Sequence, residues 1–402
     1  MTEKQRFRWT LLTAVFLVNA IVIGFSWMAT SPLVSHIVAD FALAKGAGEY
    51  IFASYAAAIA IFAVPAGMLG DRFGVRISVA IGVVITGVFG ILRGTASDFS
   101  VLLVYGFLTG TGMAFVVPNL PKAVGVWFPK EEFGIANGLV VAGVNIGNAL
   151  SVSLVGVMFL PAFGTWRACF YLVGLLALIT TIMWWVVARD TPAPPSGSGS
   201  GEKLHVHSHK IDKNAVGRIL HIRDMWPLLG MQFCILGFFI GFTGALHHFL
   251  EVKGMGGMAS FATSLALITP VIGNLLFPAM SDRTGRRKPF IIPFALITGL
   301  CIYAVSILNG VPLWIALVGV GISEGAYMPL VYAIPLEMKG VGIENAATAT
   351  GLIYCFGNIG GILIPIIAGH LITAYSFETA FMFLALVAAC VAVLNALMKE
   401  IK

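Results

Sequence analysis

One ionisable side chain stands in the middle of a long apolar stretch. Glu324 lies in the segment GVGISEGAYMP, between Gly321 and Gly325. A carboxylate is costly to bury as an ion, so in a water-poor segment it pairs, binds a cation or exchanges a proton. We predict that Glu324 takes part in proton coupling. A cation site and a neutral, hydrogen-bonded glutamate that ties helices together are the alternatives.

A second group of titratable residues lies in FTGALHHFLEVKG, at the end of another apolar stretch. Glu251 follows His247 by four residues, which places both on one helix face. Because histidine titrates near neutral pH, we predict His247 as an outer proton acceptor and His248 as a donor to an anion. An ordinary exposed helix end is the alternative.

Other polar and aromatic residues within apolar stretches are candidates for binding a ligand. Lys122, in VVPNLPKAVGVWFP, could contact an anion, and snorkelling of its ammonium group to the membrane surface is the alternative. Asn145 and Asn358 lie in glycine-rich sequences, where close helix packing explains them as readily. The predicted ligand-binding residues are Trp27, Tyr55, Lys122, Asn145, His248, Tyr327, Tyr354 and Asn358.

The sequence offers little material for an enzyme. It contains no recognisable nucleophile–base arrangement, phosphate-binding loop or ATP-binding motif. The five cysteines lack CxxC spacing and are predicted to be small buried packing residues rather than disulfides or zinc ligands. The alternating His205, His207 and His209 could bind a transition metal, with a solvated loop as the alternative. We predict no enzymatic activity, no cofactor and no resident metal.

The elements that must position these residues are membrane helices. The chain is 58% hydrophobic, only 10% charged, and has a mean hydropathy of +0.94. Apolar runs of about 20 residues recur along it, long enough to cross a bilayer, and they are apolar on every face, unlike barrel strands. The first run is too long for a cleaved signal. The predicted helices cover residues 9–37, 50–69, 77–96, 99–124, 133–160, 166–188, 226–250, 261–280, 289–308, 312–335, 345–372 and 376–397.

The distribution of basic residues predicts the orientation. With both termini cytoplasmic, only Lys45, Arg93, Arg167 and Lys253 of the 24 lysines and arginines fall at or near the outer side. Basic loops beside anionic lipid explain the net charge of +6 without a nucleic-acid partner. Arg167 is expected to reach the headgroups. The helix of Arg93 could instead extend its side chain into the interior.

Two pairs of short sequences indicate an internal duplication. GMLGDRFGVR (67–76) is a near copy of PAMSDRTGRR (278–287), and GLVVAGVNIGN (138–148) of GLIYCFGNIGG (351–361). The copies are separated by an even number of helices, so the halves run parallel in the membrane. A Pro/Ser/Gly-rich linker, 189–225, joins the predicted halves 1–188 and 226–402. The first pair aligns Asp71 with Asp282, Arg72 with Arg283, and Arg76 with Arg287.

Twelve helices, a parallel repeat, a central loop and the motif G-x-L-x-D-R-x-G-x-R together resemble the major facilitator superfamily of secondary transporters. The resemblance spans essentially the whole chain and implies two six-helix bundles, related by a pseudo-twofold axis along the membrane normal, that work by alternating access. It also implies that both charged loops latch a cytoplasmic gate, with each aspartate near a helix N-terminus or a basic partner. A plain topogenic loop would explain the arginines alone. Pro278 in place of Gly67 predicts a looser second latch. The implied gate residues are Asp71, Arg72, Arg76, Asp282, Arg283 and Arg287.

The helix 4–5 region, WFPKEEFGIANGLVVAGVNIGN, is similar to anion-handling branches that include nitrate/nitrite, cyanate-type and oxalate–formate carriers. Nitrate carriers use an arginine in helix 2 and another in helix 8, and neither helix contains a base here, which disfavours nitrate. The same stretch, with Trp27, is also similar to a branch that handles choline-like cations, where an aromatic cage with Glu324 as counter-charge would bind the ligand.

The sequence therefore predicts an all-α, multi-pass protein of the cytoplasmic membrane that moves a small organic anion, a carboxylate foremost, by proton-coupled alternating access. The alternatives are a carrier or uniporter for a choline-like cation, an exporter of cationic drugs, and a receptor that binds without transport. The expected partners are the small-molecule substrate, the proton and the lipid bilayer. The protein is expected to act as a monomer.

Overall fold

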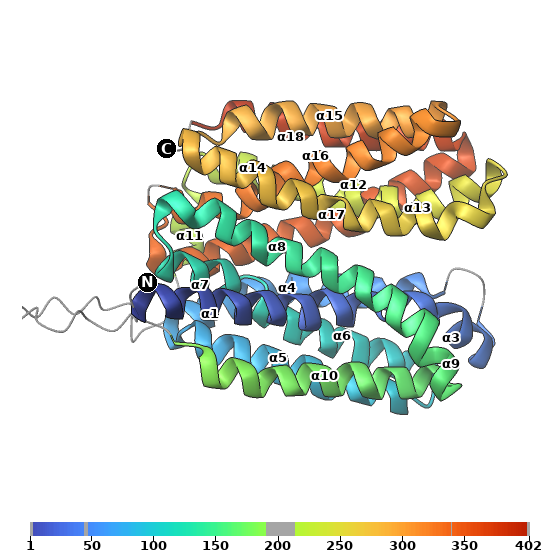
Figure 1. Ribbon diagram of the computed structural model, residues 1–402, viewed down its shortest axis with the longest axis horizontal. Coiled ribbons are helices and arrows are strands. Elements are labelled where there is room, and N and C mark those ends of the chain that lie inside the picture. The colour runs from blue at the N-terminus through green and yellow to red at the C-terminus, as the bar shows by residue number, and fades with distance from the viewer. Residues whose placement is uncertain (1–2, 44–46, 190–213, 339, 400–402) are drawn as a thin grey trace, which may run out of the picture.

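The computed structural model describes residues 3–43, 47–189, 214–338 and 340–399. Within these residues the chain is helical and forms no strand. Twelve of its helical segments are long and apolar enough to cross a membrane. The predicted all-α class and the predicted number of spans are therefore confirmed. The helices gather in two bundles that lie side by side (Figure 1).

Six spans form the first bundle. The first span is built from several short helices in succession, and the fourth and fifth are each interrupted once. The helices are α1 (Glu3–Val18), η1 (Asn19–Phe25), α2 (Ser26–Met28), α3 (Val34–Asp40), α4 (Glu49–Phe73), α5 (Val75–Leu92), α6 (Phe99–Val116), α7 (Asn119–Trp127), α8 (Lys130–Ser153), η4 (Leu154–Phe159), α9 (Leu160–Phe163) and α10 (Trp166–Val187).

Six further spans form the second bundle. The eighth span is divided at Pro270, which begins its second helix. The helices are α12 (Met225–Val252), α13 (Gly256–Ile268), α14 (Pro270–Thr284), α15 (Lys288–Ile307), α16 (Gly310–Glu337), α17 (Ala346–Ala374) and α18 (Phe377–Leu397).

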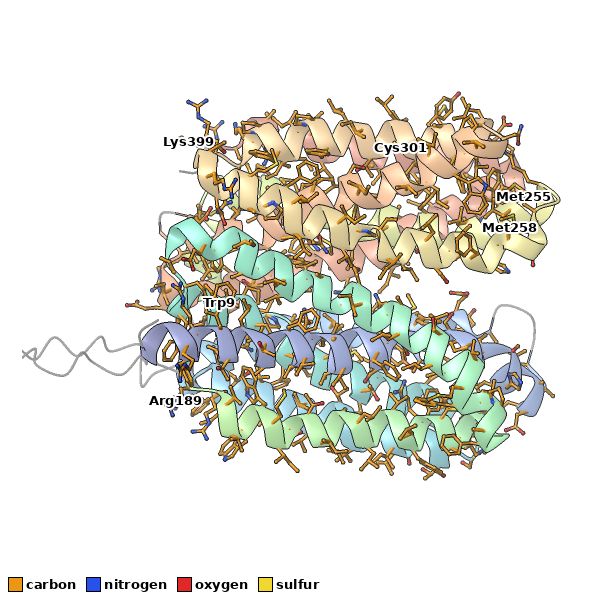
Figure 2. The ribbon with its side chains drawn as sticks, in the orientation of Figure 1. Trp9, Arg189, Met255, Met258, Cys301 and Lys399 are labelled. Carbon is orange, nitrogen blue, oxygen red and sulfur yellow. The ribbon has the colours of Figure 1, made fainter. Side chains whose placement is uncertain are left out.

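Both chain ends lie at one end of the molecule, as do the α4–α5 and α14–α15 turns (Figure 1). We call this end the terminal face and the opposite end the distal face. Trp9, Arg189 and Lys399 lie toward the terminal face, whereas Met255 and Met258 lie at the distal face (Figure 2).

The segment between the bundles contains one short helix that the linker prediction did not include. This helix, α11 (Ala215–Leu220), packs against α17. Residues 190–213, and with them His205, His207 and His209, lie outside the described residues. The predicted bundle boundaries at 188 and 226 stay predictions.

The first span departs from the continuous helix that the sequence predicts. Its middle, η1, widens into π-helical turns, and the Asn19 side-chain amide donates to the Val140 carbonyl oxygen of α8 at 2.6 Å. A π-helical turn shifts the register of the side chains that follow it. The shift sets the direction in which Trp27, just beyond η1, leaves the helix.

The bundles meet mainly through two helix pairs, α4 with α17 and α8 with α14. In the first pair, a methyl group on Gly67 would overlap the backbone of Ala347, and one on Gly351 would overlap the backbone of Ala63. Small residues let membrane helices approach this closely. The hydrogen bonds that cross between the bundles lie toward the terminal face, and the Asn137 amide, which donates to the Pro329 carbonyl at 2.8 Å, is the deepest of them.

The five cysteines form no disulfide. Cys169 is buried, as predicted, but Cys390 is exposed on α18. The prediction of burial was wrong for Cys390 because a helix that is apolar on all faces does not reveal which face turns to lipid.

Candidate functional site

Asp71, near the end of α4, joins the two bundles at the terminal face. Its carboxylate accepts a 2.5 Å hydrogen bond from Lys122 within its own bundle. From α17 it accepts bonds from the Ala347 amide at 3.2 Å, the Thr348 amide at 2.8 Å and the Thr348 hydroxyl at 2.5 Å. The first amides of a helix have no partner within the helix, so they suit an anion. We call this group the Asp71 latch.

Lys122 reaches Asp71 because the fourth span breaks. Helix α6 ends at Val116, two residues before Pro118, which has no amide hydrogen to donate. Asn119 then begins α7, and its side-chain amide donates to the Ser78 hydroxyl at 3.0 Å, which fixes α7 against α5. The side chain of Lys122 is only 3% exposed. The structure thus places Lys122 in the latch, and contact with a substrate, which we predicted for it, stays a prediction.

Asp282, at the equivalent position of α14, forms the second junction. It accepts a 2.9 Å bond from the Ile135 amide near the start of α8, and a 2.7 Å bond from Arg287. Arg287 also pairs in bidentate fashion with Glu337 at the end of α16, through Nη2 at 2.5 Å and Nε at 3.2 Å. Gly134 leaves the space that the Asp282 carboxylate fills. We call this group the Asp282 latch.

The remaining predicted gate residues lie around these latches. The Arg76 guanidinium donates to the Trp185 carbonyl at 2.7 Å and stacks 4.5 Å from the Trp185 ring. Arg72 stacks on Phe73, and Arg283 is exposed to solvent. Of the residues that hold the junctions, the sequence analysis did not identify Thr348, Ile135 and Glu337. The repeat itself offered one signal, because continuing its second alignment pairs Ile135 with Thr348.

Glu324 lies near the middle of α16 and is 2% exposed. Among the described residues its carboxylate accepts no hydrogen bond and forms no ion pair. The flanking Gly321 and Gly325 pack against Thr269 and Pro270 at the break between α13 and α14. The structure therefore holds an unpaired carboxyl group within the second bundle, which does not fit the alternative of a hydrogen-bonded tie.

The predicted aromatic residues fall into one pair in each bundle. In the first bundle the rings of Trp27 and Tyr55 meet edge to face at 5.4 Å. In the second, Tyr354 stacks on Tyr332 at 5.0 Å, and Gln232 of α12 donates to the Tyr332 hydroxyl at 2.8 Å. Gln232 is a buried polar residue that the sequence analysis did not identify.

The other predicted binding residues are scattered. Tyr327 is fully buried, one turn from Glu324. The Asn358 amide donates to the Tyr354 carbonyl of its own helix at 2.8 Å. Asn145 is buried in α8 between two glycines that pack against the first span.

The histidine cluster lies at the distal end of α12. His247 and His248 lie 3.4 and 3.5 Å from the Glu251 carboxylate, and all three side chains are about half exposed or more. The structure does not bring this cluster together with Glu324 by any contact among the described residues. Its predicted roles toward proton and anion stay predictions.

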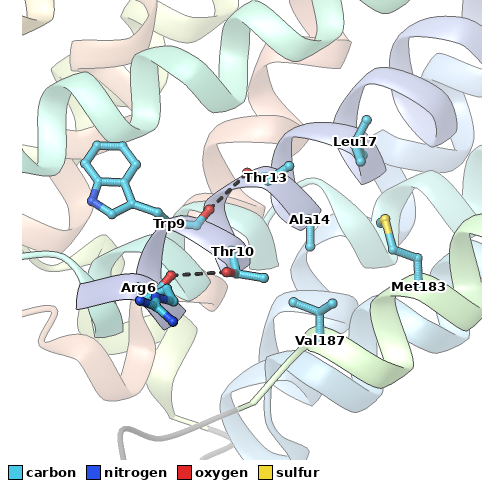
Figure 3. A pocket seen from close by; sticks show the side chains of 8 residues that line it. All are labelled: Arg6, Trp9, Thr10, Thr13, Ala14, Leu17, Met183 and Val187. Carbon is cyan, nitrogen blue, oxygen red and sulfur yellow. Dashed lines mark hydrogen bonds between the residues drawn. The ribbon is translucent and has the colours of Figure 1, made fainter. Parts of the chain in front are cut away.

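A separate groove lies on the outer surface of the first bundle, between the start of α1 and the end of α10 (Figure 3). It is lined mainly by apolar side chains, with Arg6 and Trp9 at the terminal face. The groove contains none of the predicted site residues.

Two helical bundles joined at one face by duplicated charged junctions, with an unpaired acid in one bundle, fit the class of helical membrane transporters. A comparison with known protein families supports this class. The family model described as Major Facilitator Superfamily matches residues 16–267 and 256–400. The chain belongs to the major facilitator superfamily, whose members are transporters rather than enzymes, as predicted.

Individual proteins resemble the chain over most of its length. The probable galactarate/D-glucarate transporter of Bacillus subtilis is 25% identical over 413 residues, covering 95% of this chain and 89% of the relative. The D-galactonate transporter of Escherichia coli is 24% identical, covering 94% and 92%. A solved structure of the proton:xylose symporter XylE superposes with a TM-score of 0.75 at 15% identity, covering 99% and 97%. The structural likeness shows the shared fold.

Proposed function

We propose that this protein carries small organic anions, carboxylates foremost, across the cytoplasmic membrane. The observation that carries the proposal is the similarity over nearly the whole chain to relatives named as transporters of galactarate, D-glucarate and D-galactonate. These substrates are all carboxylates. Residues 50–67 of the second span and residues 261–280 of the eighth contain no base, which argues further against nitrate.

The terminal face is the cytoplasmic one in this proposal. The basic residues crowd at this face, as the positive-inside rule requires, so both termini are cytoplasmic. Because the latches hold the bundles together there, the described conformation is closed toward the cytoplasm. Transport then requires the Asp71 and Asp282 latches to break, so that the bundles rock apart at that face. The protein works as a monomer.

In this proposal Glu324 couples proton movement to substrate transport. An ionised carboxylate without a partner is costly in a water-poor interior, so the protonated form is favoured while the residue is buried. When the cavity between the bundles opens to water, the ionised carboxylate is solvated and therefore stabilised, so the proton leaves. His247, at the distal face, is positioned to receive protons from the outside. The substrate lies between the bundles, against Trp27 and Tyr55 of one and Tyr327 and Tyr354 of the other.

The experiment is uptake of labelled D-galactonate and D-glucarate into proteoliposomes with and without an imposed pH gradient. We expect the gradient to drive accumulation by the wild-type protein. In Glu324→Gln we expect uptake that no longer responds to the gradient, whereas Glu344→Gln, at an exposed acid of the same bundle, leaves the response unchanged. Gradient-driven accumulation that persists in Glu324→Gln would remove this residue from the coupling step.

The same preparation tests the competing functions. Uptake of choline-like amines in place of carboxylates would replace the substrate class and make Glu324 a counter-charge. Ligand-dependent stabilisation without any flux would identify a receptor instead of a carrier.

A further inference from the structure

Arg93 is a buried cation that no acid of the described part of the chain neutralises. It follows α5 at the distal end of the first bundle and is 0% exposed. Among the described residues it forms no ion pair, and an arginine does not shed its proton inside a protein. A buried charge is ordinarily paired, because taking it out of water without a counter-charge is costly.

The acids of α3, α4 and the α5–α6 turn at the same end of the first bundle are engaged elsewhere or are exposed. Asp40 pairs with Arg167 and also accepts a bond from the Trp166 ring nitrogen. Asp98 caps α6 by accepting from the Val101 amide at 3.0 Å, and Glu49 is exposed. The counter-charge for Arg93 is therefore not supplied by these acids.

The guanidinium group is held in one orientation. Its Nη1 donates to the Tyr55 hydroxyl at 2.5 Å, and that hydroxyl lies 2.8 Å from the Thr30 hydroxyl. The Phe170 ring covers the guanidinium at 4.4 Å. Nε and Nη2 are buried and have no hydrogen-bond partner. One edge of the group is thus fixed by Tyr55, while the other edge presents two donors that have no hydrogen-bond partner among the described residues.

The same two atoms of another arginine show what this edge binds. In Arg287, Nε and Nη2 donate to the two oxygens of the Glu337 carboxylate. Such a fork matches a carboxylate in both spacing and charge. We propose that Arg93 binds the carboxylate of the transported anion through Nε and Nη2, with Tyr55 as the residue that positions it.

The location of Arg93 suits this role, which rests on the proposed function. The latches close the terminal face, whereas Arg93 follows the end of α5 that lies away from them, toward the distal face (Figure 1). Because Arg93 is 0% exposed, binding of the carboxylate requires the packing around Nε and Nη2 to open while Tyr55 keeps its bond to Nη1.

The test is a titration of the full-length purified protein with sodium D-galactonate and, separately, with sodium chloride, read out as thermal stabilisation. We expect Arg93→Gln to weaken the apparent affinity for galactonate about tenfold or more, because a charged hydrogen-bonding pair is lost. The matched control is Arg167→Gln, at the same end of the bundle, which should change it less than about twofold. Wild-type affinity in Arg93→Gln would overturn the proposal.

A second variant keeps the test decisive if Arg93→Gln does not fold. Arg93→Lys retains the charge but has no fork, so galactonate should bind several-fold more weakly than to the wild-type protein. Equal galactonate affinity in Arg93→Lys and wild type would overturn the role of the fork.

The outcomes separate this inference from the proposed function. Wild-type transport of galactonate with an unchanged KM in Arg93→Gln would leave the function standing and remove the site. Stabilisation by chloride alone, lost in Arg93→Gln, would keep an anion site at Arg93 and overturn the carboxylate as its ligand. No stabilisation of the wild-type protein by galactonate would overturn the Arg93 site, and the absence of galactonate uptake into proteoliposomes as well would overturn the proposed function.

Discussion

The two latches occupy duplicated positions but are built differently. Asp71 receives three hydrogen bonds from the opposite bundle, whereas Asp282 receives one. Asp282 instead belongs to an ion network within its own bundle, in which Arg287 pairs with it and with Glu337. Most bonds to Asp71 therefore cross between the bundles, whereas most bonds of the Asp282 latch lie within the second bundle.

The cations differ as well. Arg76 and Arg287 are equivalent in the repeat, but Arg287 pairs with its aspartate while Arg76 stacks on Trp185. At Asp71 the cation comes from Lys122 on α7. A duplicated motif thus preserves the aspartate and its helix N-terminus, and leaves the choice of counter-charge to the surrounding helices. The comparison predicts unequal contributions of the two latches to closure.

The largest effect is expected from Asp71→Asn. The substitution leaves the Lys122 ammonium buried without an acid, and breaking a buried pair in this way costs about 3 kcal/mol. Asp282→Asn should cost about 1 kcal/mol, because Arg287 keeps Glu337 as its partner. The measurement is the rate of maleimide labelling of Val64→Cys, a position at which α4 packs on α17.

If labelling reports the open population, Asp71→Asn should accelerate it about a hundredfold and Asp282→Asn about fivefold. The protein without the introduced cysteine gives the background from the five natural thiols. Equal acceleration by the two substitutions would show that the intra-bundle network matters as much as the crossing bonds.

The sequence predicts the twelve helices and the two aligned aspartates, but not the groups that pair with each aspartate. Helix number and class follow from the length and composition of the apolar runs, and the aligned Asp71 and Asp282 follow from the repeat. The partner of Asp71 does not, because Arg76 is closer in the chain than Lys122. Lys122 points to Asp71 only after the break at Pro118 and the Asn119 hydrogen bonds have turned α7.

The candidate site is likewise only partly predictable. The position of Glu324 within an apolar segment marks it without any structure. The lack of a partner for Arg93 cannot be read from its sequence, because it depends on Asp40 and Asp98 being engaged by other groups. Whether Arg93 has a counter-charge is therefore decided by how the helices of the bundle pack.

A second prediction concerns the origin of the large effect. In the double variant Asp71→Asn/Lys122→Met both charges are absent, so no buried ion is left unpaired. We expect closure to recover by about 1–2 kcal/mol relative to Asp71→Asn alone. The labelling rate should fall accordingly, by about tenfold. A double variant as open as the single one would mean that the bonds to α17, and not the charge of Lys122, control closure.

A smaller effect is expected at Thr348. Its hydroxyl donates to Asp71, whereas the aligned residue of the other latch, Ile135, has no hydroxyl. Thr348→Val keeps the shape of the side chain and both backbone bonds to Asp71 but removes the 2.5 Å hydroxyl bond. The expected loss is about 1 kcal/mol, or roughly a fivefold increase in labelling. Thr350→Val, which removes a bond within α17 only, is the control and should change labelling little.

The smallest effect, and the only gain, is expected from Ile135→Thr. The repeat places Ile135 opposite Thr348, and each residue gives its backbone amide to the latch aspartate of the other bundle. Threonine at this position adds the hydroxyl donor that the Asp282 latch lacks, at the expense of some apolar contact from the half-buried isoleucine. We expect the closed conformation to be stabilised by about 0.5–1 kcal/mol, seen as slower labelling of a cysteine on the α8–α14 interface.

The control is Ile135→Val, which removes apolar contact without adding a hydroxyl. It is needed because Asp282 already binds Arg287, so a new donor competes for the same carboxylate oxygens. Labelling that is as fast in Ile135→Thr as in Ile135→Val would show that the single bond is imposed by Arg287 rather than by the residue at 135.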